Sequence, residues 1–201
     1  MEDQEVLEVF SANGVARGRA TRQDVHRQGL WHQTFQIWLV EVDAGVPWVW
    51  FQRRSPQKAQ YANLWDITVA GHLLAGEEPD QGFREVREEL GINIDPVGAS
   101  YFGVVPDEIV LAPGADRELC HVYFAPAPCD LSELEWAPSE VADVGRVPLD
   151  QAASLVRGLR NSMTITTPHA AHAVTAEMLV PHSDDYYRTV FTGLVQHFGS
   201  R

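Results

Sequence analysis

Apolar residues alternate or cluster in five segments that are predicted to be extended. The longest runs from Leu30 to Val42, where Trp, Phe, Ile, Leu and Val are interleaved with polar residues, a pattern typical of a half-buried strand. The other segments predicted as strands are Val6 to Phe10, Val46 to Gln52, Leu64 to Val69 and Leu119 to Phe124.

Four further segments have a helical pattern. Gln81 to Leu90 is rich in Glu and Arg and is followed by Gly91, a residue that commonly ends helices. Asp150 to Arg157 is also predicted as a helix, and Thr167, followed by a proline suited to a first turn, predicts another. The last helix opens at Ser183 and carries an apolar stripe expected to be buried, made of Tyr187, Val190, Phe191, Leu194 and Phe198.

The order of these elements predicts a mixed α/β sandwich, because strands and helices interleave without strict alternation. A length of 201 residues fits one domain, and a hydrophobic content of 45% allows a sizeable core. No apolar run approaches the ~20 residues needed to span a bilayer. The acidic start of the chain is unlike a secretory signal, so we expect a cytoplasmic protein with no membrane partner.

The charge balance narrows the set of partners. The chain carries 15 basic and 28 acidic side chains, a net charge of −13. Nucleic-acid polymers and anionic membranes require a basic face, so both are excluded as general partners. A phosphorylated small molecule remains compatible, because carboxylates can bind it through metal ions. The sequence does not indicate an oligomeric state, and it is compatible with a homodimer.

The helix from Gln81 to Leu90 carries the candidate chemistry. Glu85, Glu88 and Glu89 stand at i, i+3 and i+4, so their carboxylates share one helix face. Oxygen-only clusters of this kind suit Mg²⁺ or Mn²⁺. The alternative interpretation is a solvated acidic face, relieved by the neighbouring Arg84 and Arg87.

The residues around this helix resemble the Nudix box, written G-x5-E-x7-R-E-U-x-E-E-x-G-U with U an aliphatic residue. The positions that match in type are Gly71, Glu77, Arg84, Glu85, Val86, Glu88, Glu89, Gly91 and Ile92. One departure is that six residues, rather than seven, separate Glu77 from Arg84. The missing residue falls before or at the start of the helix, so the register of the three glutamates is intact.

The resemblance implies a Nudix-type α/β/α sandwich around a mixed sheet. We expect a single domain over residues 1–201, with the Nudix core at about 24–157 and a helical C-terminal extension at 160–201. It also implies a divalent-metal enzyme that hydrolyses a diphosphate linkage. Glu85, Glu88 and Glu89 would bind Mg²⁺ or Mn²⁺ with the carbonyl of Gly71 close by, and Arg84 would brace the glutamates.

A subgroup similar to isopentenyl-diphosphate isomerase extends the resemblance over roughly residues 24–125. Asp24 to Leu39 resembles the opening strand of that subgroup. Arg53, Arg54 and Lys58 stand at positions whose basic residues grip the substrate diphosphate in the isomerases, and guanidinium and ammonium groups suit phosphate oxygens. The alternative is solvated charge at a strand end.

The same subgroup holds a metal through histidines and carboxylates. The positions that match here are His26, His32, His72, Asp116 and Glu118, which gives a possible second metal site, with structural histidines as the alternative.

One position separates this chain from the isomerases. Their catalytic cysteine is replaced by Ala70, which cannot exchange the proton that allylic isomerisation requires. A hydrolase acting on a nucleoside diphosphate derivative or another small organic pyrophosphate is therefore favoured. An isomerase-like enzyme and a non-catalytic nucleotide-binding module are the alternatives.

Overall fold

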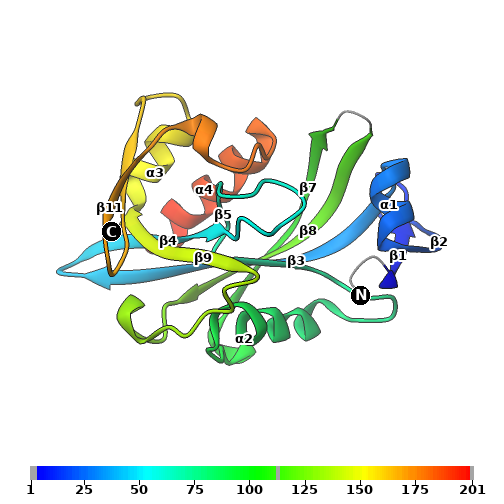
Figure 1. The fold of residues 1–201 in the computed structure, drawn as a ribbon, viewed down its shortest axis with the longest axis horizontal. Coiled ribbons are helices and arrows are strands. Elements are labelled where there is room, and N and C mark those ends of the chain that lie inside the picture. Colours follow the sequence, from blue (N-terminus) through cyan, green and yellow to red (C-terminus); the bar gives the residue numbers. More distant parts are fainter. Residues whose placement is uncertain (1–3, 112–113, 200–201) are drawn as a thin grey trace.

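The computed structural model describes residues 4–111 and 114–199, so residues 1–3 and 200–201, the ends of the predicted 1–201 domain, lie outside the described residues. The described chain forms one 11-stranded sheet with helices on both of its faces (Figure 1). The strands are β1 (Val6–Phe10), β2 (Ala16–Thr21), β3 (Trp31–Asp43), β4 (Val46–Arg54), β5 (Trp65–Asp66), β6 (Val69–His72), β7 (Ser100–Val110), β8 (Ala115–Pro126), β9 (Val141–Pro148), β10 (Met163–Thr166) and β11 (Ala171–Val174). The α-helices are α1 (Arg22–Gln28), α2 (Arg84–Leu90), α3 (Leu149–Val156) and α4 (Asp184–Phe198).

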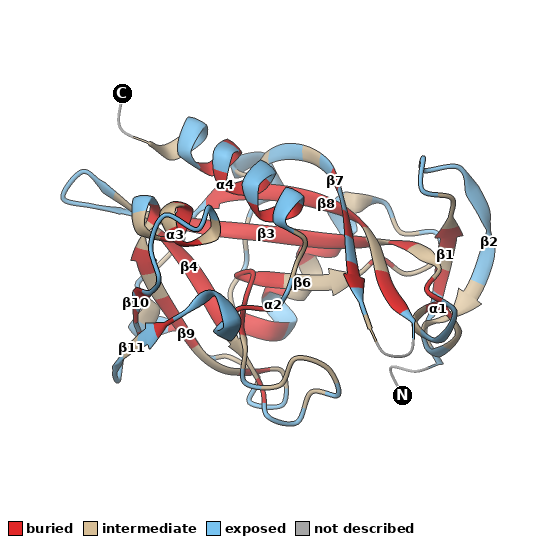
Figure 2. Ribbon diagram, turned by 90° about the horizontal axis from the view of Figure 1, so that it is seen from above, coloured by how far each residue is buried: buried red, intermediate tan, exposed pale blue. Residues whose placement is uncertain are grey.

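Strand β3 is the centre of the sheet, and its middle is buried (Figure 2). It pairs in parallel with β8 from Trp31 to Val40. It also pairs antiparallel with β6 over Thr34–Ile37 and with β4 over Val40–Asp43. Strands β4 and β6 pair with different parts of β3. Side chains near the ends of β4 and β6 can therefore face a common opening in the sheet.

Two apolar layers cover the sheet, as the fold class predicted. Phe83, Val86 and Leu90, in α2 and the turn before it, pack on one face with Phe35 and Ile37 of β3. Leu155 of α3 and Phe191 of α4 pack on the other face with Trp38 of β3 and Phe51 of β4. The alternation of β3 side chains between the two layers is the period of a strand buried on both sides. The α/β/α sandwich is confirmed.

Helix α4 has the apolar stripe that the sequence predicts. Its N-cap is Ser183, whose side chain accepts a hydrogen bond from the backbone N–H of Tyr186. The stripe residues Tyr187, Val190, Phe191 and Leu194 are buried, and Phe198 packs partly buried against the same cluster. Within residues 4–111 and 114–199, no helix is long and apolar enough to cross a membrane.

The prediction of a helix that opens at Thr167 is wrong, because this segment is the turn of a β-hairpin formed by β10 and β11. The hydroxyl of Thr167 accepts hydrogen bonds from the backbone N–H groups of His169 and Ala170, which stabilises a turn in place of a helix. Met163 and Ile165 alternate with exposed threonines, the period of a strand. The C-terminal extension therefore contains a hairpin before its helix.

Other boundaries differ from the predictions for local reasons. Asp24 to Leu39 is not one strand, because Thr21 caps helix α1 and Gly29, in the left-handed conformation at φ 61°, ends it. The segment from Leu64 to Val69 is divided between β5 and the start of β6. Strands β2, β7 and β9 were not predicted. Pro106 lies within β7, where it is tolerated because the described part of the chain pairs β7 with β8 alone.

Candidate active site

A cleft of about 260 Å³ lies where β3, β4, β6 and the start of α2 meet. Its lining combines side chains from both faces of the sheet. Gln36 and Ala70 belong to the α4 side, whereas Glu85 and Glu89 reach it from α2. The lining is mostly polar, with acidic and basic groups from the site predicted in the sequence.

The three glutamates of α2 are placed on one side of this cleft but with unequal exposure. The side chain of Glu85 is 14% exposed, and Glu89 is 7% exposed. Glu88 lies at the rim, with 59% of its side chain exposed. The predicted i, i+3, i+4 face therefore exists, and two of its carboxylates lie inside the protein.

Arg84 binds the acidic groups on either side of it. Its Nε and Nη2 donate to the two carboxylate oxygens of Glu77 at 3.0 and 3.1 Å, and its Nη1 donates to Glu85 at 2.5 Å and to Glu88 at 3.4 Å. Nη2 also donates to the backbone carbonyl of His72 at 3.0 Å, which ties the helix to β6. These hydrogen bonds hold Glu77, Glu85 and Glu88 around one guanidinium group.

The six-residue spacing between Glu77 and Arg84 is accommodated by a 3₁₀ helix over Pro79–Phe83. A 3₁₀ helix rises ~2.0 Å per residue against ~1.5 Å for an α-helix, so fewer residues cover the same distance. Gly82 lies against Phe35 in this turn, and a Cβ on it would be 2.3 Å from the Cβ of Phe35. The shorter segment therefore still brings Glu77 to Arg84.

Gly71 lies directly beneath Glu85. A Cβ at Gly71 would be 2.2 Å from the Cδ of Glu85 and 2.4 Å from its Oε1. No side chain larger than hydrogen fits between β6 and this carboxylate. The first glycine of the motif is therefore explained by the close approach of the backbone to Glu85.

Burial makes the charged form of these carboxylates costly. Burial raises the pKa of Glu85, against the opposing charge of Arg84. Burial, and then the charge of Glu85, raises the pKa of Glu89 well above its usual value. Gln52 donates to Glu89 at 3.1 Å, a neutral partner that does not compensate the charge. A divalent cation is the kind of ligand that would offset both carboxylates.

The basic residues predicted to bind phosphate are not placed alike. Arg54 and Lys58 line the cleft, and Arg53 does not lie among the described residues that line it. Arg54 donates through Nη1 to Asp66 at 2.9 Å, and Lys58 is ion-paired with Glu140.

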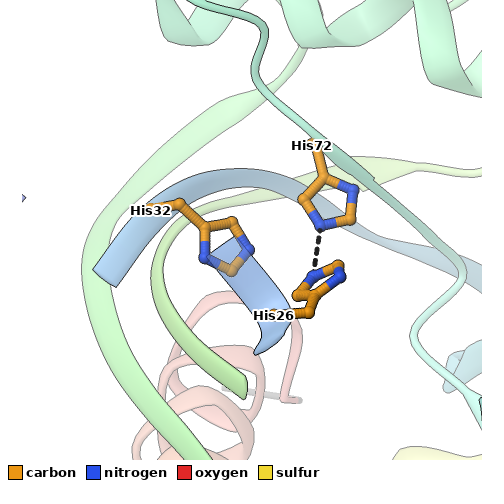
Figure 3. Close-up of side chains that lie close together, drawn as sticks. All are labelled: His26, His32 and His72. Carbon is orange, nitrogen blue, oxygen red and sulfur yellow. Dashed lines mark hydrogen bonds between the residues drawn. The ribbon is translucent and has the colours of Figure 1, made fainter. Parts of the chain in front are cut away.

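The three predicted histidines come together (Figure 3), and two of them, His26 and His72, line the same cleft, whereas His32 is fully buried beside them. The rings of His26, His32 and His72 lie 5.1 to 5.4 Å apart, and His26 Nε2 is 3.2 Å from His72 Nε2. Asp116 Oδ1 is 3.6 Å from His26 Nε2 and 3.8 Å from His32 Nε2. Ligand atoms of His32, Asp116 and Glu118 also lie within 4.8 Å of one another.

Two atoms of this histidine cluster are buried without a hydrogen-bond partner, His32 Nε2 and Asp116 Oδ1. The other ring nitrogen of His32 lies 3.1 Å from the carbonyl of Leu30, which fixes the ring and leaves Nε2 with its lone pair toward the cluster. Burial is the main cause that lowers the pKa of His32 and of His72. Neutral imidazoles are the form that binds metal ions.

Sequence reasoning missed His182, which also lines the cleft. Its Nδ1 and Nε2 lie 2.7 Å from Asp107 and 3.1 Å from Asp66. No local pattern signalled this role, because these three residues are far apart in the chain and meet only through the packing of α4.

No thiol lines the cleft in the described part of the chain, where the two cysteines are Cys120 and Cys129. Ala70 pairs with Gln36 across β6 and β3 and lines the cleft. Cys120 is fully buried, with its thiol toward Glu118 at 3.5 Å.

Comparisons with known proteins agree with this geometry. The family model of the NUDIX domain matches residues 31–167. An uncharacterized Nudix hydrolase of Clostridium acetobutylicum is 28% identical over 205 residues, covering 98% of this chain and 100% of the relative. An isopentenyl-diphosphate Delta-isomerase of Paenarthrobacter aurescens is 28% identical over 158 residues, covering 71% of this chain and 82% of the isomerase.

A crystal structure of a protein from Deinococcus radiodurans has the same fold, with a TM-score of 0.58 and 20% identity over 77% of this chain and 90% of that one. The fold and the acidic helix thus define a NUDIX-domain protein. The chain belongs to the Nudix family of hydrolases and is a pyrophosphohydrolase. The matched residues end before His182 and α4, which lie outside the family model.

Proposed function

We propose that this protein is a divalent-metal-dependent hydrolase of a nucleoside diphosphate derivative or another small organic pyrophosphate. The observation that supports this most strongly is a pair of carboxylates that face one cleft with raised pKa values, the buried Glu89 and the largely covered Glu85. Evolution of a stable fold alone would favour neutral residues at such positions, because uncompensated buried charge is costly.

The residues present fit a hard divalent cation. Glu85, Glu88 and Glu89 supply carboxylate oxygens, and the absence of a side chain at Gly71 leaves the β6 backbone against Glu85. Mg²⁺ and Mn²⁺ prefer such oxygen ligands. When bound, the ion neutralises phosphate oxygens and lowers the pKa of a water that attacks phosphorus.

The protein's own groups have three tasks in this proposal. Arg84 keeps Glu77, Glu85 and Glu88 oriented through the hydrogen bonds described above. A carboxylate of the site accepts the proton of the attacking water. Arg54 and Lys58, which also line the cleft, bind the substrate phosphates, and Lys58 does so by exchanging its ion pair with Glu140 for one with phosphate. Arg53 is the least favourably placed of the three basic residues.

We also propose that His26, His32, His72, Asp116 and Glu118 form a second metal site. The buried unpaired atoms His32 Nε2 and Asp116 Oδ1 support this, because a structural histidine cluster would satisfy them with hydrogen bonds. Imidazole and carboxylate ligands suit a transition metal such as Mn²⁺ or Zn²⁺.

The alternatives are less well supported. An isomerase needs a proton donor at the position of Ala70, and no described cysteine lines the cleft. A non-catalytic nucleotide-binding module would have no need of acids that are withdrawn from solvent, yet Glu89 is buried and the side chain of Glu85 is only 14% exposed.

The decisive experiment is a substrate panel with product identification. Nucleoside diphosphates and triphosphates, sugar nucleotides, dinucleotides, and prenyl and thiamine diphosphates would each be tested with Mg²⁺ or Mn²⁺. We expect hydrolysis of at least one diphosphate linkage that stops in EDTA and is restored by excess metal. Full activity in EDTA, or no turnover of any diphosphate, would refute the proposal.

A further inference from the structure

Four charged side chains form a continuous hydrogen-bonded chain in the wall of the cleft: Arg54, Asp66, His182 and Asp107. The first three line the cleft, and Asp107 lies beyond them. They come from the end of β4, from β5, from the segment before α4 and from β7. The side chains of Asp66, His182 and Asp107 are 4%, 6% and 1% exposed, so solvent screens these interactions little.

Both carboxylates among these four side chains accept hydrogen bonds on both of their oxygens. Asp66 accepts from Arg54 on Oδ2, and on Oδ1 from His182 and the backbone N–H of Ile67. Asp107 accepts from His182 on Oδ2 and from the backbone N–H of Ser183 on Oδ1 at 2.9 Å. Both ring nitrogens of His182 therefore face carboxylates, and both donate when the ring is an imidazolium.

The charge of His182 follows from these contacts. Burial opposes the imidazolium, but the hydrogen bonds to Asp107 and Asp66 outweigh it and raise the pKa of His182 to about 10. The ring also stacks on Tyr186, with centroids 4.7 Å apart. A histidine that is charged and donates through both nitrogens cannot act as a general base.

The charge of His182 affects the position of the Arg54 guanidinium. With a charged His182 in place, positive and negative side chains alternate from Arg54 to Asp107, and Asp66 accepts a hydrogen bond from one edge of the Arg54 guanidinium. Nε of Arg54 donates to the carbonyl of Gln60 at 3.3 Å, and 21% of the side chain remains exposed at the cleft. Without the imidazolium, Asp66 and Asp107 would repel each other and both would draw Arg54 inward.

We propose that His182 is a positioning residue that holds Arg54 in the cleft wall for the substrate diphosphate. The proposal rests on the proposed function, because it assumes that the free N–H groups of Arg54 bind phosphate. It assigns a role in substrate binding to a segment beyond the residues that the family model matches. His182 itself acts only through Asp66 and Arg54.

The test is His182→Gln, which keeps a hydrogen-bonding side chain but removes the charge. We expect KM for the best diphosphate to rise about tenfold or more with kcat nearly unchanged, since charged hydrogen bonds to substrate are lost in both ground and transition states. Binding of methylenediphosphonate with Mg²⁺, measured by calorimetry, should weaken by the same factor. His182→Lys should recover part of the loss, because it restores a cation.

A matched control is Tyr187→Phe, which removes the buried hydrogen bond from Tyr187 to the carbonyl of Val180 in the same segment. It should lower thermal stability without changing KM. In an Arg54→Ala background, His182→Gln should have little further effect on KM or on methylenediphosphonate binding, because the two residues act in series.

Three results with the variants would overturn the inference: an unchanged KM in His182→Gln, an additive effect in the Arg54→Ala background, or an equal KM change in Tyr187→Phe. If His182→Gln does not fold, the same comparisons are made with His182→Lys and Asp107→Asn. A wild type that hydrolyses no diphosphate would refute the proposed function, whereas the binding measurements would still decide the role of His182. Failure of methylenediphosphonate to bind the wild type would overturn the inference as well.

Discussion

Replacing Gly71 with alanine should separate the geometry of the carboxylate site from the stability of the fold. The new Cβ would be 2.2 Å from the Cδ of Glu85, more than 1 Å inside an ordinary contact near 3.4 Å. Glu85 must therefore move by about 1 Å, and with it the hydrogen bond from Arg84. Displacement of a catalytic group by ~1 Å can cost about 100-fold in rate. Overpacking of this size costs roughly 1–3 kcal/mol of stability, and less where a flexible side chain can turn away.

The assay compares kcat with saturating Mg²⁺ and the melting temperature of Gly71→Ala, with Gly98→Ala as the control. A Cβ at Gly98 meets nothing within 4 Å, so this variant should match the wild type in both measurements. We expect Gly71→Ala to lose about 100-fold in kcat while its melting temperature falls by only a few degrees. Activity of Gly71→Ala within twofold of the wild type would show that Glu85 is not placed by this contact, and the reasoning would be wrong.

Three other predictions concern Glu89, His182 and Ala70. The metal-free wild type should lose stability as the pH rises above the ordinary pKa range of glutamate, because burial raises the pKa of Glu89. Glu89→Gln should therefore melt at an equal or higher temperature than the wild type at pH 7, while its turnover falls by several orders of magnitude. The stability that His182 contributes should be fully present below pH 6.5 and lost as the pH rises to about 10, a loss of up to ~5 kcal/mol. The free energy of unfolding of His182→Gln, measured by urea denaturation, should therefore not fall with pH in this range. An equal fall in the variant would contradict the ion pairs of His182 with Asp66 and Asp107. The wild type should not interconvert isopentenyl and dimethylallyl diphosphate, since Ala70 provides no thiol, and detectable isomerisation by mass spectrometry would show that another residue supplies the acid.

The elements that could be predicted are those whose signal is local. The i, i+3, i+4 spacing of the glutamates fixes a common helix face whatever surrounds it. The apolar stripe of α4 likewise predicts burial, and its members Tyr187, Val190, Phe191 and Leu194 are buried as expected. The long alternation in β3 predicts a strand for the same reason.

Other features depend on contacts that the sequence does not order. Thr167 and its following proline suit a helix start, but the threonine hydroxyl binds the backbone of a turn between two strands. Arg53 and Arg54 are adjacent in sequence, yet a β-bulge separates them and only Arg54 lines the cleft. His182 reaches Asp66 across 116 residues, which no spacing rule predicts.

The proposed hydrolase requires that Glu85 and Glu89 hold a divalent ion in the cleft. The most direct measurement is a Mn²⁺ titration followed by electron paramagnetic resonance of the free ion. It compares the wild type with Glu85→Gln/Glu89→Gln and with Glu177→Gln, which changes an exposed acid elsewhere. We expect the double variant to bind at least one Mn²⁺ fewer than the wild type, and Glu177→Gln to bind as the wild type does. Equal binding by the double variant and the wild type would contradict the proposed metal site.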